Sequence, residues 1–484
     1  MSHELARLLP ECSLMAGLLL VLAVDLFLPP ARRRVLGWIG AVTCAAATWL
    51  AWAAESGPIG TLLVVDGISR LVRPLLCAFG ALWFVAADRD ADSRADRGAL
   101  AVAMLGLVLG SLLTTGSTHL LMLWIGIELM SLPSYVLAAW RGGDRKAAEA
   151  GMKYVLFGGF ASGLMVFGLS HVYGITGSLE FALIAASLAQ GMPVAVAAAL
   201  GLAAVGVLYK LAIVPLHFYA PDVYQGAPAL SVAAVGVLPK LGAIAALGRA
   251  LVVLQPSGFV SVPQVSQVLA AAAVASMLVS AFTALVQRDA KRILAFSAIG
   301  HAGTALLALA ALPGELALAA AGFHLLTYGV ATFGALVCLA GFEREPGGTS
   351  LEALAGAGRR QPWQTAALCL FLGSLAGIPP LAGFVGKFGV LAEVVSAGMS
   401  EAHGGRKVLV LAALALLLTT VVSAWSYLLI VRAAILAPAP AAPTPTAAGG
   451  LGWGERCVVL VCAVAALGLG FWFDGLGVVA ALLP

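Results

Sequence analysis

Apolar stretches of about twenty residues recur along almost the whole sequence, and each is long enough to cross a membrane as one α-helix. Of the 484 residues, 61% are hydrophobic and only 10% are charged, whereas a soluble domain carries about 25% charged residues. A soluble helical protein of this length would lack a polar surface, so the sequence predicts an all-α polytopic membrane protein. Its apolar segments, about fourteen in number, centre near residues 20, 45, 78, 105, 128, 163, 203, 240, 275, 301, 328, 378, 420 and 468.

The basic residues predict the orientation of these segments. The cluster 32–34 follows the first apolar segment, whereas a signal peptide would have its basic residues in front. If the N-terminus lies outside, inner loops hold 18 of the 27 Lys and Arg residues, outer ends hold six and three lie within segments. Basic residues favour the cytoplasmic side, so we expect an even number of crossings with both termini outside. The small net charge of +4 gives no indication of nucleic-acid binding.

The cysteines and glycines give no sign of a bound cofactor. None of the seven cysteines forms a C-x-x-C pair, and the motifs that bind zinc, iron–sulfur clusters or nucleotides need such paired cysteines or glycine-rich loops. We therefore interpret the cysteines as small buried apolar residues and expect neither a metal nor a cofactor on this chain.

Two segments are interrupted by prolines, at 203–228 (Pro215, Pro221) and at 364–398 (Pro379, Pro380). They lie five segments apart and therefore run in opposite directions, which is typical of transporters built from two inverted repeats that each contain a broken helix. The predicted division is N-terminal helices at 1–97, a first five-helix repeat at 98–253, a second at 264–434, a Pro/Ala-rich inner linker at 435–455 and a last helix at 456–484.

Charged residues lie in the middle of several apolar segments, where each costs about 2.5–3.5 kcal/mol. They are Glu128, Lys210 and Lys240, with Lys387 in the second broken segment; Lys153 lies at an inner end. A fixed ion pair or a side chain that extends to the interface is the structural alternative for each. One acid among lysines does not make a hard-cation site, but buried lysines change protonation readily. The pattern therefore favours a proton path.

The prolines fit the same interpretation. They free backbone carbonyls, and unwound backbone at membrane depth is tolerated only against protein or water. Water there would hydrate the lysines, and His217, His301 and His324 could extend a relay, because imidazole titrates near neutral pH. The alternative for each histidine is a hydrogen bond that packs two helices together.

Several motifs resemble one known family. The stretch "HFYAPDVYQGAP" (217–228) after "YKLAIVP", together with "SLAGIPPLAGFVGKF" (374–388), looks like the signature of subunit N of respiratory complex I, whose mitochondrial counterpart is subunit 2. The stretches at 123–140, 149–179 and 287–303 are similar to that family in kind and order, and the resemblance runs from about residue 5 to the C-terminus.

The resemblance implies a fourteen-helix, antiporter-like subunit that pumps protons while quinone is reduced elsewhere in the complex. Carried over by position, Glu128 is the acid of the fifth helix, Lys210 its partner on the seventh, Lys240 the central lysine, Lys387 the exit lysine, and Lys153 the lysine that begins the sixth helix. NADH, FMN, iron–sulfur clusters and quinone are then expected on partner subunits. The neighbours would be other membrane-arm subunits and lipid, in a bacterial inner membrane with both termini periplasmic.

The sequence also departs from the family. Pro239 directly precedes Lys240, where a kink could move the ammonium group, and His324 and Thr304 stand where tyrosines are usual. The alternatives are a subunit of a multi-subunit cation/proton antiporter or of a membrane-bound hydrogenase, and a structural subunit without transport. The "PDVYQGAP" loop favours complex I. On that basis we hypothesise that Glu128 and Lys210 form a switchable ion pair.

Overall fold

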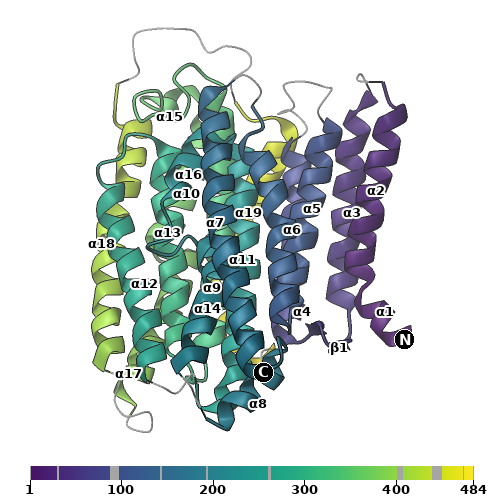
Figure 1. Ribbon diagram of the computed structural model, residues 1–484. Helices are drawn as coiled ribbons and strands as arrows, with labels where there is room; N and C mark the ends of the chain where they lie inside the picture. Colours follow the sequence, from purple (N-terminus) through teal and green to yellow (C-terminus); the bar gives the residue numbers. More distant parts are fainter. Residues whose placement is uncertain are drawn as a thin grey trace.

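The chain forms a bundle of long, roughly parallel helices (Figure 1). The computed structural model describes residues 2–29, 32–87, 97–141, 144–191, 194–259, 263–400, 407–438, 450–472 and 474–482. Its helices are α1 (Ser2–Arg7), α2 (Leu9–Phe27), α3 (Arg34–Ala53), α4 (Gly67–Ala86), α5 (Arg97–Gly116), α6 (Leu120–Ala138), α7 (Arg145–Thr176), α8 (Phe181–Ala189), α9 (Val194–Leu211), α10 (Tyr219–Gly226), α11 (Ala229–Leu254), α12 (Pro263–Ala284), α13 (Ala290–Ala310), α14 (Ala317–Glu343), α15 (Ala357–Arg360), α16 (Pro362–Ala376), α17 (Ala382–Met399), α18 (Lys407–Ile435), α19 (Trp453–Phe471) and α20 (Gly475–Leu482).

The predicted membrane architecture is confirmed. Within the described ranges, thirteen helices are long and apolar enough to span a membrane, and this number includes α17, the second half of one broken helix. The shorter α9 continues into α10 and adds one crossing, which makes fourteen. An even number returns the chain to its starting side, and Figure 1 shows both termini at the same end of the bundle.

Burial separates the helices that face lipid from those that form the core. The membrane-spanning windows of α11 and α14 are completely buried, whereas only about a third or less of α2, α7 and α18 is buried. Their outward residues are large and apolar, for example Leu19, Phe160 and Val421. Such a surface is stable only against lipid or another apolar partner.

Both proline-rich segments are broken helices, as predicted. The first leaves the helical path at Ala212, whose φ of 58° is left-handed, and resumes at α10. The second breaks between α16 and α17 at Gly377, whose φ is 87°. Pro239 lies inside α11, which continues through this residue as one helix.

A few features differ from the sequence prediction. A two-stranded hairpin, β1 (Gly57–Ile59) and β2 (Leu63–Val65), joins α3 to α4. The last long helix begins at Trp453 rather than at residue 456, and the short α20 follows it. Most of the predicted Pro/Ala-rich linker, 439–449, lies outside the described residues.

Buried ion pairs fasten the end of the bundle that carries the termini. Arg249 of α11 donates to both oxygens of Asp66, the N-cap of α4, at 2.6 and 2.7 Å. Arg73 of α4 pairs with Glu11 of α2 at 2.5 Å. Burial raises the pKa of Asp66, but the hydrogen bonds and charge of Arg249 outweigh it, so the pKa of Asp66 is lowered.

Candidate proton path

Lys210 lies in an aromatic cage near the end of α9. Its side chain is buried, and its Nζ has no hydrogen-bond partner. The rings of Tyr135, Tyr154 and Tyr209 surround the ammonium, with centroids at 5.4, 5.2 and 5.7 Å. A cation within about 6 Å of a ring face is stabilised by the ring quadrupole, most strongly where water is excluded. The cage thus surrounds an ammonium group to which no carboxylate is hydrogen-bonded.

The hypothesised Glu128–Lys210 pair is open in this structure. Glu128 is half-buried on α6, and Lys210 forms neither an ion pair nor a hydrogen bond with it. Tyr135, which contributes one ring to the cage, lies on the same helix as Glu128. Glu128 and Lys210 therefore lie on neighbouring helices, and aromatic rings rather than the carboxylate surround the ammonium group.

Lys240 joins the first broken helix to α13. Its buried ammonium donates to the carbonyl oxygen of Leu211 at 3.0 Å and to that of Ala298 at 2.8 Å. In a continuous helix the Leu211 carbonyl would accept from the N–H of residue 215, four positions later. That residue is Pro215, which has no N–H. The proline therefore leaves a carbonyl at membrane depth, and a lysine from another helix satisfies it.

Lys387 repeats this relationship in the second broken helix. Its ammonium donates to the carbonyl oxygen of Ala376, the last residue of α16, at 3.3 Å. The helical partner of that carbonyl would be Pro380, again without an N–H. A side chain at Gly377 would lie 3.3 Å from the Lys387 Cδ, and its left-handed backbone also favours glycine.

The predicted histidines His301 and His324 lie together beside Lys387. His301 Nδ1 is 3.2 Å from His324 Nε2, and both rings are buried. His301 Nε2 is 3.5 Å from the Tyr427 hydroxyl, which is 2.6 Å from Ser297 Oγ. These groups form a hydrogen-bonded chain from α14 through α13 to α18.

A polar pocket connects that chain to Lys387. It lies between α12, α13, α17 and α18 and encloses about 280 Å³, including its open side. A pocket lined by several hydroxyls and an ammonium is polar enough to hold water. Its polar lining residues are Ser297, His301, Thr304, Lys387, Thr419, Thr420, Ser423 and Tyr427.

Lys153 lies apart from this buried row. Its ammonium is 2.7 Å from Glu149 and 2.6 Å from Asp222, in a partly exposed cluster. Arg292 of α13 binds the other oxygen of Asp222 at 2.7 Å. The aspartate of the "PDVYQGAP" loop thereby ties α10 to α7 and α13, which supports the fixed ion-pair alternative for Lys153.

The structure does not join His217 to the other histidines. His217 is buried in the first break, its Nδ1 has no partner, and its ring lies against Phe218. Pro221 is buried in α10, whereas Pro215, Pro379 and Pro380 are exposed at the two breaks. Across the described ranges, no three His, Cys, Asp or Glu side chains are arranged to hold a metal ion.

The sequence prediction missed the tyrosines. Seven of the eight tyrosines are buried; the exception is Tyr173. Phenolic hydroxyls are rarely placed in an apolar interior without a partner, so their concentration in the apolar segments around Lys210 was the available signal.

Comparison with known proteins shows the family to which the chain belongs. The family described as NADH:quinone oxidoreductase/Mrp antiporter, TM matches residues 117–404. The NADH-quinone oxidoreductase subunit N of Geobacillus kaustophilus is 35% identical over 96% of this chain and 94% of its own length. The subunit N of Rhizorhabdus wittichii is 34% identical over 93% of each chain.

Solved structures agree. A chain of respiratory complex I from Thermus thermophilus superposes with a TM-score of 0.79 at 33% identity, over 98% of this chain and 99% of that chain. A chain of the Mrp complex from Dietzia sp. DQ12-45-1b has a TM-score of 0.81 at 21% identity over 100% of this chain and 98% of that chain, which shows a shared fold only. With its antiporter-like fold and full-length similarity, the chain belongs to the subunit N family of NADH-quinone oxidoreductases.

Proposed function

We propose that this chain is a proton-translocating membrane-arm subunit of NADH:quinone oxidoreductase, coupled to quinone reduction elsewhere in that complex. The observation that carries the proposal is the row of lysines at Lys210, Lys240 and Lys387, each held at or beside a broken helix. Intramembrane ionisable residues commonly mark proton or ion pathways. The family relationship indicates the complex to which the chain would belong.

The path runs through these lysines in sequence. Glu128 closes on Lys210 in one state, and the tyrosine cage holds Lys210 in the other. When the pair opens, the proton passes to Lys240 and then through water, His301 and His324 to Lys387. Lys153 lies outside this row, in its ion pair with Asp222 at the inner end. Moving one charge against 100 mV costs about 2.3 kcal/mol, so the energy has to come from the redox subunits.

The rest of the assignment follows from the same family. NADH, FMN, iron–sulfur clusters and quinone belong to partner subunits, and this chain contributes to the enzyme as its translocating part. The protein lies in the bacterial inner membrane, next to other membrane-arm subunits and lipid, and both termini face the periplasm. The two inverted five-helix repeats, 98–253 and 264–434, each supply one of the broken helices.

The test is quinone-linked proton uptake by the assembled complex in vesicles, with wild type compared with Lys210→Ala. We expect uptake and coupled turnover to fall while assembly is retained. Glu128→Ala should lower uptake in the same way. Unchanged uptake in Lys210→Ala would leave the chain as a structural subunit, and uptake that requires sodium would favour the cation/proton antiporter alternative.

A further inference from the structure

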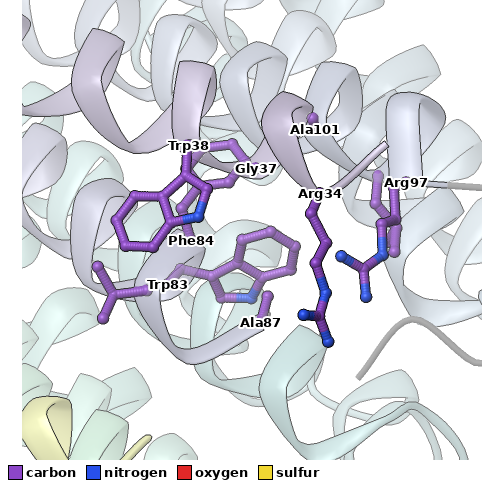
Figure 2. A pocket seen from close by; sticks show the side chains of 10 residues that line it. Arg34, Gly37, Trp38, Trp83, Phe84, Ala87, Arg97 and Ala101 are labelled. Atoms are coloured by element: carbon purple, nitrogen blue, oxygen red, sulfur yellow. The ribbon is translucent and has the colours of Figure 1, made fainter. Parts of the chain in front are cut away.

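The proposed path ends at Lys387, in the second broken helix, and a proton there still has to reach the end of the bundle that carries the termini. The helix α17 ends at that end (Figure 1), and α14 begins beside it. We call the line of contact between these two helices the α14–α17 seam. The pocket lined by Arg34 and Trp38 (Figure 2) lies at the beginnings of α3 and α5, at the opposite end of the bundle. It therefore offers Lys387 no outlet on the side of the termini.

His324 presents an unsatisfied ring nitrogen to this seam. Its Nε2 is 3.2 Å from His301 Nδ1, whereas its own Nδ1 is buried and has no hydrogen-bond partner in the described part of the chain. A Cβ at Gly386 would lie 3.4 Å from that Nδ1, so the nitrogen faces α17 one residue before Lys387. The charge of Lys387 acts on His324, so the two side chains lie near each other. Buried polar atoms almost always have a partner in the protein or in ordered water, and the Nδ1 therefore requires one in the seam.

Glu393 lies on the same face of α17, closer to the termini. Gly386, Val390 and Glu393 follow the helical spacing i, i+4, i+7, and Glu393 is about 10 Å from Gly386 along the axis. Its side chain is buried, and the backbone N–H of Leu316, the N-cap of α14, faces its carboxylate. Among the described residues, the one charged side chain that acts on Glu393 is another acid, Glu315. A buried carboxylate without a cation is costly, and a bound proton removes that cost.

The turn between α13 and α14 covers this carboxylate. A Cβ at Gly314 would overlap Glu393 Oε1, so the backbone of the turn lies directly against the carboxylate. The next residue, Glu315, is exposed. A single layer of backbone thus separates Glu393 from the surface of the protein.

Small side chains line the seam between His324 and Glu393. On α14, Ala317 and Ala320 lie seven and four residues before His324 and therefore share its face, and both are buried. A methyl side chain leaves more space for water than a larger one. At about 2.8 Å for each hydrogen bond, about three waters span the roughly 10 Å between the two groups.

We infer that Glu393 is the proton-release group of this chain, and that it receives protons from Lys387 through waters held by His324 Nδ1 and the α14–α17 seam. The inference rests on the proposed function. The Lys387 ammonium gives one proton to the water chain, and the Glu393 carboxylate takes up one proton from it to become a carboxylic acid. The acid then gives that proton to solvent beside Gly314, which restores the carboxylate.

The test compares Glu393→Gln with wild type in the assembled complex in vesicles. The amide keeps the shape of the side chain and an oxygen toward the Leu316 N–H, but it cannot take up a proton. We expect quinone-linked proton uptake to fall at least about tenfold, while the temperature of thermal unfolding stays at the wild-type value. Glu55→Gln is the matched control, because Glu55 follows the end of α3 at the same end of the bundle and its side chain is 79% exposed. Wild-type uptake in Glu393→Gln overturns the inference and leaves Glu393 as a cap of α14.

Lys210→Ala, measured in the same vesicles, separates this inference from the proposed function. If Lys210→Ala loses uptake and Glu393→Gln retains it, Glu393 is not the release group and the proposed function stands. Uptake retained in both variants removes the proposed function as well.

A measurement on the wild-type complex does not depend on any variant. An apolar carbodiimide reacts with protonated carboxylic acids, so Glu393 should be modified during quinone reduction and much less without it. Mass spectrometry of the peptide that contains Glu393 gives the extent of modification. A carboxylate that only caps α14 stays ionised and unmodified, and equal modification with and without quinone reduction also overturns the inference.

Discussion

The ammonium group of Lys210 lies 5.2 Å from the centre of the Tyr154 ring, and no carboxylate is bonded to it. Tyr154 is itself stacked on Tyr219, with centroids 4.8 Å apart and an interplanar angle of 11°. A ring fixed in this way can stabilise a charge without reorganising. In the proposed path, the Glu128 carboxylate and the tyrosine rings therefore compete for the same ammonium group.

Replacing that ring should change the pH range in which the protein works. One ring contributes about 1 kcal/mol to the protonated form, so in Tyr154→Leu the alkaline limb of the proton-uptake profile should move about 0.7 pH unit lower. Tyr154→Phe retains the aromatic face and should keep the wild-type limb. The measurement is dye-reported uptake from pH 6 to 9, and equal profiles for Leu and Phe would rule out a cation–π role.

Lys240→Met should uncouple the two halves of the path. The variant retains the length of the side chain but leaves the carbonyls of Leu211 and Ala298 without their donor. We expect quinone-linked proton uptake to fall at least about tenfold, because a buried relay group is lost. Lys407→Met, at the exposed start of α18, is the control. Wild-type uptake in Lys240→Met would exclude this lysine from the path.

Tyr427→Phe removes one hydroxyl from the hydrogen-bonded chain between Ser297 and His301. The ring still fills the buried site, so assembly should be unaffected, whereas proton uptake should fall about tenfold if the hydroxyl carries protons. The exposed Tyr173 supplies the control variant Tyr173→Phe. Comparable uptake in both variants would show that the hydroxyl at 427 serves packing alone.

Asp66→Asn should destabilise the end of the bundle near the termini in a pH-dependent way. Leaving buried Arg249 without its carboxylate costs about 3–5 kcal/mol. The pKa of Asp66 is lowered in the folded protein, so its contribution is present above the unfolded value of about 3.9 and disappears as pH falls through the folded value.

Thermal unfolding of the purified complex checks this pH dependence of stability. Wild type and Asp66→Asn should differ at pH 7 and converge in acid. Asp25→Asn breaks a more exposed pair with Arg33 and should cost no more than about 1 kcal/mol. A gap between wild type and Asp66→Asn that stays constant down to pH 3 would contradict the role of the charge.

The sequence was sufficient to predict the crossings and the two breaks, because the length and polarity of a segment determine whether it spans a bilayer. The freed carbonyls also follow from it, since Leu211 and Ala376 each lie four residues before a proline. The groups that donate hydrogen bonds to these two carbonyls cannot be predicted from the sequence. Lys240 reaches Leu211 from a different helix, whereas Lys387 reaches Ala376 from within its own broken helix.

Contacts between neighbouring helices explain the other differences between the sequence prediction and the structure. Helices that are apolar on all sides have little apolar periodicity. The rotation of such a helix about its own axis therefore cannot be predicted from the sequence. For this reason the sequence did not predict that Tyr135 and Tyr154 face Lys210. The ion partners of Lys153 come from its own helix and from α10, and only the first of these is a sequence neighbour. Tertiary packing therefore decided which predicted residues meet.

An ammonium group has three N–H bonds, and Lys240 uses two of them on carbonyl oxygens. A neutral amine keeps two N–H bonds and gains a lone pair. Lys240 can therefore release its third proton while both carbonyls stay satisfied, and the lone pair then points in the direction in which the proton left. The site is ready to accept the next proton without rotating a side chain or moving a helix.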